Sequence, residues 1–248
     1  MTRASLLLLP LALGIGFTGA THRSFFGSRP HLARHSADAS GSLGHEIESA
    51  FDRVPGPEDA RVAARRKIEE SESTTYIAEI LAEHDSSVAR WPDRRTQPLT
   101  VWVQPASGIA DFNKIYVEQV RQAFEEWDRL QLPVHFTFVN DSADADVHVN
   151  WVDRFSEPIS GRTRWTRDDD WLITDANILL ALHHIGGERL DYDAMHAIAL
   201  HEIGHLLGLD HTQDTLSIMA PRVRVRELSN VDTATVRLIY ALPAGPLR

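Results

Sequence analysis

The order of hydrophobic and polar residues predicts interleaved strands and helices in a domain that begins near Trp91. Alternation with a period of two indicates strands, because successive side chains of a strand point to opposite faces. Apolar residues three or four positions apart predict a strong amphipathic helix over about 113–130. The predicted strands cover residues 98–104, 134–140, 146–152 and 175–182, the last with a more continuous apolar run. One compact domain with a single core is the simplest interpretation.

The chain before Trp91 divides into three parts with different patterns. Residues 1–20 have an early cation, then an apolar run and small residues, which is the layout of a secretory signal peptide. Residues 21–56 are rich in Ser, Gly, His and Arg without sustained periodicity, and residues 57–84 are rich in helix formers. We therefore expect a signal peptide, and then a flexible leader with a helical pro-segment or spacer over residues 21–90.

Composition narrows the function without identifying it. The chain has 248 residues, of which 43% are hydrophobic and 24% charged, as in a globular protein. Its formal net charge is −10 and it has no long Lys/Arg run, which argues against a nucleic-acid partner. There is no cysteine, so disulfides are excluded and any crosslink within the fold must come from a metal.

The strongest chemical signal is the segment HEIGHLLGLDH, residues 201–211. Apolar residues before and within it fall at helical intervals, so His201 and His205 are predicted one turn apart on the same helix face. Two imidazoles so placed can bind one zinc ion. Gly208 suits a helix end with a left-handed residue, after which the chain can bring His211 back as a third ligand.

Glu202 is the residue that makes this pattern catalytic rather than structural. Three histidine ligands leave the fourth tetrahedral position of zinc open, which distinguishes a hydrolytic site from a closed structural one. Glu202 follows the first ligand directly, where its carboxylate can act on metal-activated water without being a ligand. We therefore assign the metal to the three histidines and the role of general base to Glu202.

The segment 201–211, followed by TQDTLSIMAP, resembles the matrixin branch of the metzincin metallopeptidases. The resemblance extends over about residues 91–242, including RWPDRRTQPLTVWV upstream and a closing helix over 229–242. It implies an α+β zincin-like fold, with a twisted mixed sheet packed on helices, for a catalytic domain over residues 91–248. It also implies that Met219 forms the methionine turn, a packing role beneath the zinc.

Three departures from the family pattern change what the resemblance implies. Without cysteine, the cysteine switch that keeps animal matrixins latent is excluded. The stretch 155–171 has no histidine, so we expect no structural zinc, and Asp168 to Asp170 are read as an exposed hairpin tip, with calcium ligation as the alternative. Val223 stands two residues after Pro221, where the family often has tyrosine, so the rim of the specificity pocket is altered.

The resulting hypothesis is a zinc-dependent endopeptidase that acts on protein or peptide substrates as a monomer. An extended peptide is expected to pair with an exposed edge of the strand around 178–182, so that Ile178 and Leu180, with Pro221 and Val223, contact the substrate. The alternative is a catalytically silent zinc-binding module that recognises peptide or matrix. Glu202 argues against this alternative, because a residue beside an open zinc that is not a ligand has little structural reason to be glutamate.

Location and latency rest on the N-terminal residues. The signal sequence predicts a secreted protein, extracellular or periplasmic, with no stable membrane span after signal removal; a retained anchor is the alternative. If residues 57–84 inhibit the enzyme, they must do so without a thiolate, and His84 and Asp85 are the candidates that could reach the metal. A surface location for both, with the helices as spacer or packing element, is the other interpretation.

Overall fold

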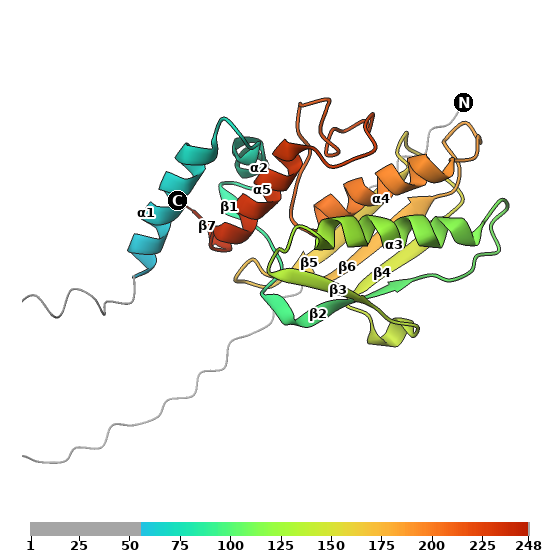
Figure 1. Cartoon of the computed structure of the whole chain (residues 1–248), viewed down its shortest axis with the longest axis horizontal. Coiled ribbons are helices and arrows are strands. Elements are labelled where there is room, and N and C mark those ends of the chain that lie inside the picture. Colours follow the sequence, from blue (N-terminus) through green and yellow to red (C-terminus); the bar gives the residue numbers. More distant parts are fainter. Residues whose placement is uncertain (1–55, 248) are drawn as a thin grey trace, which may run out of the picture. The chain divides into compact units, whose positions relative to one another are not determined.

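A computed structural model describes residues 56–247 of the chain (Figure 1). The predicted signal peptide and nearly all of the predicted flexible leader lie outside these residues. No helix within 56–247 is long and apolar enough to cross a membrane. The elements in chain order are α1 Pro57–Ser71, α2 Ile77–Glu83, β1 Ser87–Val88, β2 Arg94–Val103, α3 Lys114–Asp128, β3 Val134–Phe138, a 3₁₀ turn at Ser142–Asp144, β4 Val147–Val152, β5 Gly161–Arg167, β6 Ile173–Ala181, α4 Tyr192–Leu206, α5 Asn230–Ala241 and β7 Gly245–Pro246.

A five-stranded mixed sheet carries the domain, with the strand order β3-β2-β4-β6-β5. Four strands run parallel, and β5 pairs antiparallel with β6 through a hairpin. In β4 the burial alternates residue by residue, as the period-two pattern of its sequence predicts. The α+β fold with a mixed sheet packed on helices is thus confirmed.

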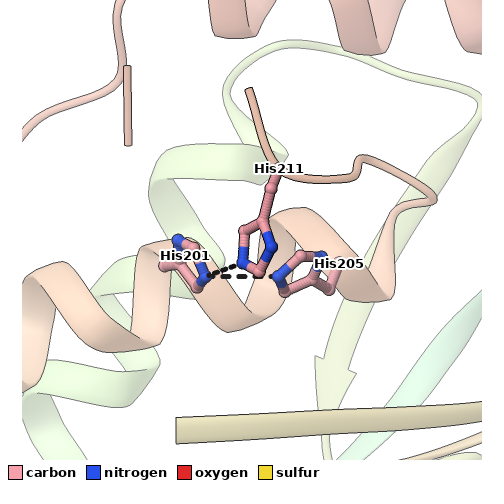
Figure 2. Close-up of side chains that lie close together, drawn as sticks. All are labelled: His201, His205 and His211. Atoms are coloured by element: carbon pink, nitrogen blue, oxygen red, sulfur yellow. Dashed lines mark hydrogen bonds between the residues drawn. The ribbon is translucent and has the colours of Figure 1, made fainter. Parts of the chain in front are cut away.

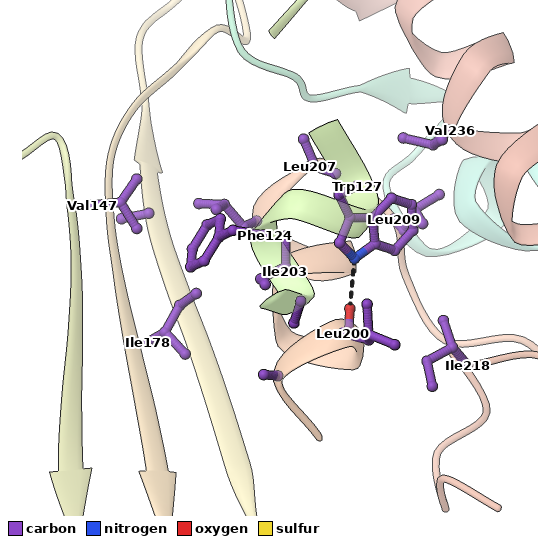
Figure 3. Close-up of a cluster of buried hydrophobic side chains, with 14 of the residues drawn as sticks. Phe124, Trp127, Val147, Ile178, Leu200, Ile203, Leu207, Leu209, Ile218 and Val236 are labelled. Atoms are coloured by element: carbon purple, nitrogen blue, oxygen red, sulfur yellow. Dashed lines mark hydrogen bonds between the residues drawn. The ribbon is translucent and has the colours of Figure 1, made fainter. Parts of the chain in front are cut away.

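Helices α3 and α4 pack together over the sheet and enclose the core (Figures 1 and 3). The apolar face of α3 is fully buried, and Phe124 and Trp127 are among the largest side chains of the core. The indole of Trp127 donates a hydrogen bond of 3.0 Å to the carbonyl of Leu200, so its one polar atom is satisfied inside the core (Figure 3). This bond joins α3 directly to the helix that carries the histidines.

The edge of the sheet differs from the sequence-based expectation. Strand β6 lies between β4 and β5, so it has no free edge, and Ile178 and Leu180 are buried in the core with exposures of 1% and 0%. The prediction that this strand pairs with a peptide through residues 178–182 is therefore wrong. The edge strand beside β6 is β5, whose sequence GRTRWTR lacks apolar alternation because the strand is half exposed.

The two N-terminal helices pack against the C-terminal helix α5 (Figure 1). Tyr76, Ile77, Ile80 and Val88 are buried at 4%, 0%, 2% and 1% exposure and belong to the same hydrophobic core as the sheet. Strand β1 pairs antiparallel with β7, which ties this segment to the C-terminal residues. Residues 56–247 lie in one compact unit, so no boundary between compact units falls at Trp91.

Candidate metal and catalytic site

Helix α4 presents His201 and His205 on one face, and His211 approaches them from the following loop (Figure 2). The helix begins at Tyr192, and the preceding Asp191 is its N-cap, whose side chain accepts a hydrogen bond from the amide of Ala194. His201 is buried, His205 is partly buried and His211 is exposed. Within residues 56–247 these three form the one group of histidine or carboxylate side chains positioned to hold a metal.

The three imidazoles fit a zinc ion in both distance and tautomer. The Nε2 atom of His201 lies 3.2 Å from that of His205 and 3.3 Å from that of His211 (Figure 2). Ligand atoms on a tetrahedral zinc at 2.0–2.1 Å are about 3.3 Å apart. Carbonyl oxygens only accept, so Nδ1 of His201 donates to Ile218 (2.7 Å) and Nδ1 of His205 donates to Leu209 (3.0 Å).

These bonds leave a lone pair on Nε2 of His201 and of His205, which can be donated to a shared cation. Burial lowers the pKa of His201 to about 3 and that of His205 to about 4. Both imidazoles are therefore neutral at neutral pH, which is the form that binds metal. The donor set and its geometry thus fit zinc.

Gly208 ends the helix in the conformation that the sequence predicts. Its φ is +94°, in the left-handed region that glycine adopts without a side-chain penalty. The amides of Gly208 and Leu209 bond back to the carbonyls of His205 and Gly204, as in a helix terminus that reverses the chain. A Cβ at Gly208 would also overlap the carbonyl oxygen of Ala89, so the N-terminal segment adds a second requirement for glycine.

Glu202 lies in the same cleft with a different environment. Its side chain is 4% exposed, and burial raises its pKa to about 7. The hydroxyl of Thr163 on β5 donates a hydrogen bond of 2.7 Å to Oε2 of Glu202 and also lies 2.9 Å from its carbonyl oxygen. A carboxyl group with a pKa near neutrality is suited both to accept and to return a proton at physiological pH.

The methionine turn, which contains Met219, holds His201 in place through hydrogen bonds. Asp232 on α5 accepts hydrogen bonds from the hydroxyl of Ser217 and, at 3.1 Å, from the amide of Ile218. The carbonyl of Ile218 in turn accepts a hydrogen bond from Nδ1 of His201, so α5 positions a candidate metal ligand through the turn. Met219 is fully buried at 0% exposure next to this bond.

The close packing of Met219 against α4 explains why residue 204 is a glycine. A Cβ at this position would overlap Sδ of Met219 and come within 3.5 Å of Trp127, so the helix can approach the turn only without a side chain. A Gly204→Ala variant gains about 1 kcal/mol of helix propensity but overpacks a buried contact at about 1–3 kcal/mol. We expect a net loss of stability and weaker zinc retention, measured by thermal unfolding and by competition with a chelator.

The matched control is Gly108→Ala, because a Cβ there meets nothing within 4 Å. It should leave both the melting temperature and the zinc affinity close to those of the wild type. If Gly204→Ala were as stable as this control, the close packing of Met219 against α4 would not matter for the site.

The N-terminal segment holds the loop that carries His211. The carboxylate of Glu79 on α2 accepts hydrogen bonds of 2.9 Å from both the hydroxyl of Thr212 and the amide of Gln213. Nε2 of His84 donates to Oδ2 of Asp210 at 3.1 Å, and this hydrogen bond is the main cause that lowers the pKa of Asp210 to about 2. The contacts therefore lie on both sides of His211.

A cleft of about 780 Å³ contains the three histidines and Glu202. Of the predicted substrate residues, Pro221 and Val223 line this cleft, whereas Ile178 and Leu180 do not. Strand β5 contributes Gly161 to Thr163 and Trp165 to the lining. His84, a candidate to reach the metal, lies at the cleft but is bonded to Asp210 rather than grouped with the three histidines.

The acidic hairpin tip between β5 and β6 uses one of its carboxylates within the turn. Oδ1 of Asp168 accepts hydrogen bonds from the amides of Asp170 (3.0 Å) and Leu172 (2.8 Å). His183, which follows β6, forms hydrogen bonds with Asp153 at 2.8 Å and with Asp111 at 3.1 Å. These contacts raise the pKa of His183, with the hydrogen bond to Asp111 as the main cause.

Comparison with known proteins shows that residues 154–241 match the matrixin family model. The chain is 26% identical over 172 residues to Metalloendoproteinase 5-MMP of Arabidopsis thaliana, covering 61% of this chain and 45% of the relative. It is 27% identical over 154 residues to human neutrophil collagenase, covering 52% and 29%, and 27% identical over 155 residues to human matrix metalloproteinase-16, covering 50% and 23%. The matches thus span less than half the length of these relatives.

Proposed function

Because the chain belongs to the matrixin type of metzincins, we propose that it is a zinc-dependent endopeptidase that hydrolyses peptide bonds. The observation that carries the proposal is the convergence of three Nε2 atoms at 3.2 and 3.3 Å beside a buried carboxyl group in an open cleft. His201, His205 and His211 would hold the zinc ion. When bound there, zinc would supply Lewis acidity that polarises a carbonyl and makes water more acidic.

The protein's own residues account for proton transfer and orientation. Glu202 acts as general base and then as general acid, because its raised pKa lets it take a proton from water and deliver it to the leaving amine. Thr163 fixes the orientation of this carboxylate through the 2.7 Å bond to Oε2. The carbonyls of Ile218 and Leu209 keep both helix imidazoles in the tautomer that presents Nε2 to the metal.

The substrate would bind along β5 rather than along β6. Strand β5 is the edge of the sheet and lines the cleft, so its free backbone groups can pair with an extended peptide. Ile159 and Ile185 are exposed by 36% and 51% although they are large and apolar, and both line the same cleft. Such exposed apolar side chains at a cleft are suited to contact with a partner. Pro221 and Val223 form another part of its wall.

Domain organisation and location extend the proposal. We propose that residues 57–88 act as a packing element of the catalytic unit, on the basis of their buried core residues and their bonds to the loop of His211. Residues 1–20 would direct export as a signal peptide, as their apolar run suggests. Secretion and action as a monomer therefore remain parts of the proposed function.

Metal analysis and peptide hydrolysis together test the proposal. The purified protein should bind one zinc ion per chain, because residues 56–247 hold one suitable group of ligands. Chelation should abolish peptide cleavage and added zinc should restore it. His205→Ala should lose the metal, whereas His148→Ala on β4, outside the cleft lining, should keep it. Tight zinc binding without cleavage of any peptide would instead support the silent recognition module.

A further inference from the structure

The cleft is lined by positive charge in a protein whose formal net charge is −10. Its charged lining other than histidine comprises four arginines but only two carboxylates, Glu202 and Asp210. The arginines are Arg162, Arg222, Arg224 and Arg226. The cleft wall therefore has a charge opposite in sign to that of the whole chain.

Three of the arginines come from one short segment, residues 221–226, with the sequence PRVRVR. Val223 and Val225 are partly buried and pack against the hydrophobic core, whereas the arginines between and beside them are exposed. All six residues line the cleft. The alternation thus anchors the segment through its valines and directs its guanidinium groups to the solvent side of the cleft.

The two cleft carboxylates already have partners within the protein. Glu202 accepts a hydrogen bond from the hydroxyl of Thr163, and Asp210 accepts one from His84. Two arginines are likewise paired, Arg162 with Glu157 at 3.2 Å and Arg226 with Asp193. Within residues 56–247, no ion pair involves the remaining two, Arg222 and Arg224.

We infer that the cleft selects peptide segments with acidic side chains next to the scissile bond, and that Arg222 and Arg224 bind these carboxylates. This inference rests on the proposed endopeptidase function. Guanidinium groups bind carboxylates in a planar, two-bond geometry, so arginine confers orientation as well as charge. The accessible apolar part of the lining, including Ile159, Ile185 and Ile198, accommodates the uncharged portion of the same segment.

Two peptides that differ only in charge provide the test. Fluorogenic substrates with Glu or Gln on both sides of the cleavage site are compared by kcat/KM at low and at high ionic strength. We expect the Glu peptide to be preferred about threefold to tenfold at low ionic strength, since exposed charge pairs contribute modestly, and less at high ionic strength. Equal kcat/KM values for the two peptides would overturn the inference while leaving the endopeptidase function intact.

The variants separate a local contact from the overall charge. Arg222→Gln/Arg224→Gln should lose most of the preference for the Glu peptide over the Gln peptide, measured as the ratio of the two kcat/KM values. The matched control, Arg61→Gln/Arg65→Gln, removes the same charge from exposed positions of α1 and should keep the preference. An equal loss of preference in both double variants would show that net charge, not the cleft wall, selects the substrate, and would overturn the inference.

A peptide-binding measurement tests the acidic selectivity separately from peptide cleavage. Zinc-loaded Glu202→Gln protein is titrated with labelled Glu and Gln peptides, and binding is followed by fluorescence anisotropy. We expect the Glu peptide to bind more tightly than the Gln peptide. If the wild type cleaved no peptide but this difference in affinity were present, only the endopeptidase function would be refuted. Equal affinities for the two peptides would refute the acidic selectivity.

Discussion

Replacement of Glu202 by Gln is expected to lower kcat by about 10²- to 10⁴-fold while the zinc affinity stays close to that of the wild type. The reason is that the three histidines are untouched, whereas an amide cannot take and return a proton. The Gln side chain still offers an oxygen to the hydroxyl of Thr163, so the fold of the site should persist. Steady-state kinetics on one peptide substrate and a zinc titration measure the two effects separately.

The matched control is Glu125→Gln, which makes the same chemical change at an exposed position of α3. It should leave both kcat and the zinc affinity unchanged. Turnover at the wild-type rate in Glu202→Gln would contradict the assignment of the general base, and loss of zinc from that variant would mean that the carboxylate supports the ligands rather than the proton transfer.

Removal of residues 56–88 is expected to prevent stable folding. A protein starting at Ala89 would lose Tyr76, Ile77, Ile80 and Val88 from the core, together with the pairing of β1 with β7. Burial of four such side chains stabilises a protein by about 6–12 kcal/mol. This is comparable to the whole stability of a domain, about 5–15 kcal/mol. Thermal unfolding of this protein is compared with that of one starting at Gly56.

The comparison also decides between packing and inhibition. If the shorter protein folded and cleaved peptides faster than the longer one, residues 56–88 would be an inhibitory pro-segment. A point variant gives the same answer without truncation: Ile80→Ala in the longer protein should lower the stability by about 2–5 kcal/mol. It should not raise the activity of the folded fraction.

The parts of the fold that bury one face were predictable from sequence. Helix α3 was predicted over 113–130 and spans 114–128, because one stripe of it lies in the core. Strand β5 was missed, since an edge strand of Arg and Thr residues shows no apolar alternation. The order of strands was also not readable from local pattern, and Ile178 and Leu180 were therefore placed at an edge although β6 lies inside the sheet.

The candidate site divides in the same way. The sequence identifies four candidate residues of the site because they lie at a characteristic spacing within eleven residues, on one helix and the turn that follows it. These residues are His201, Glu202, His205 and His211. The partners that orient them come from distant positions, as Thr163 is 39 residues from Glu202 and Glu79 is 133 residues from Thr212. Such contacts depend on the assembled fold, so local sequence patterns do not predict them.

The hydrogen bonds of Glu79 and His84 with the loop of His211 couple the docking of α2 to zinc binding at residues far away along the chain. Glu79 and His84 restrain the residues on either side of His211, the proposed zinc ligand that is itself exposed. By thermodynamic reciprocity, docking of α2 strengthens zinc binding by the same factor as zinc binding strengthens docking of α2. The amide hydrogens of α2 should therefore exchange faster in the metal-free protein, and would report on an ion that this helix does not itself touch.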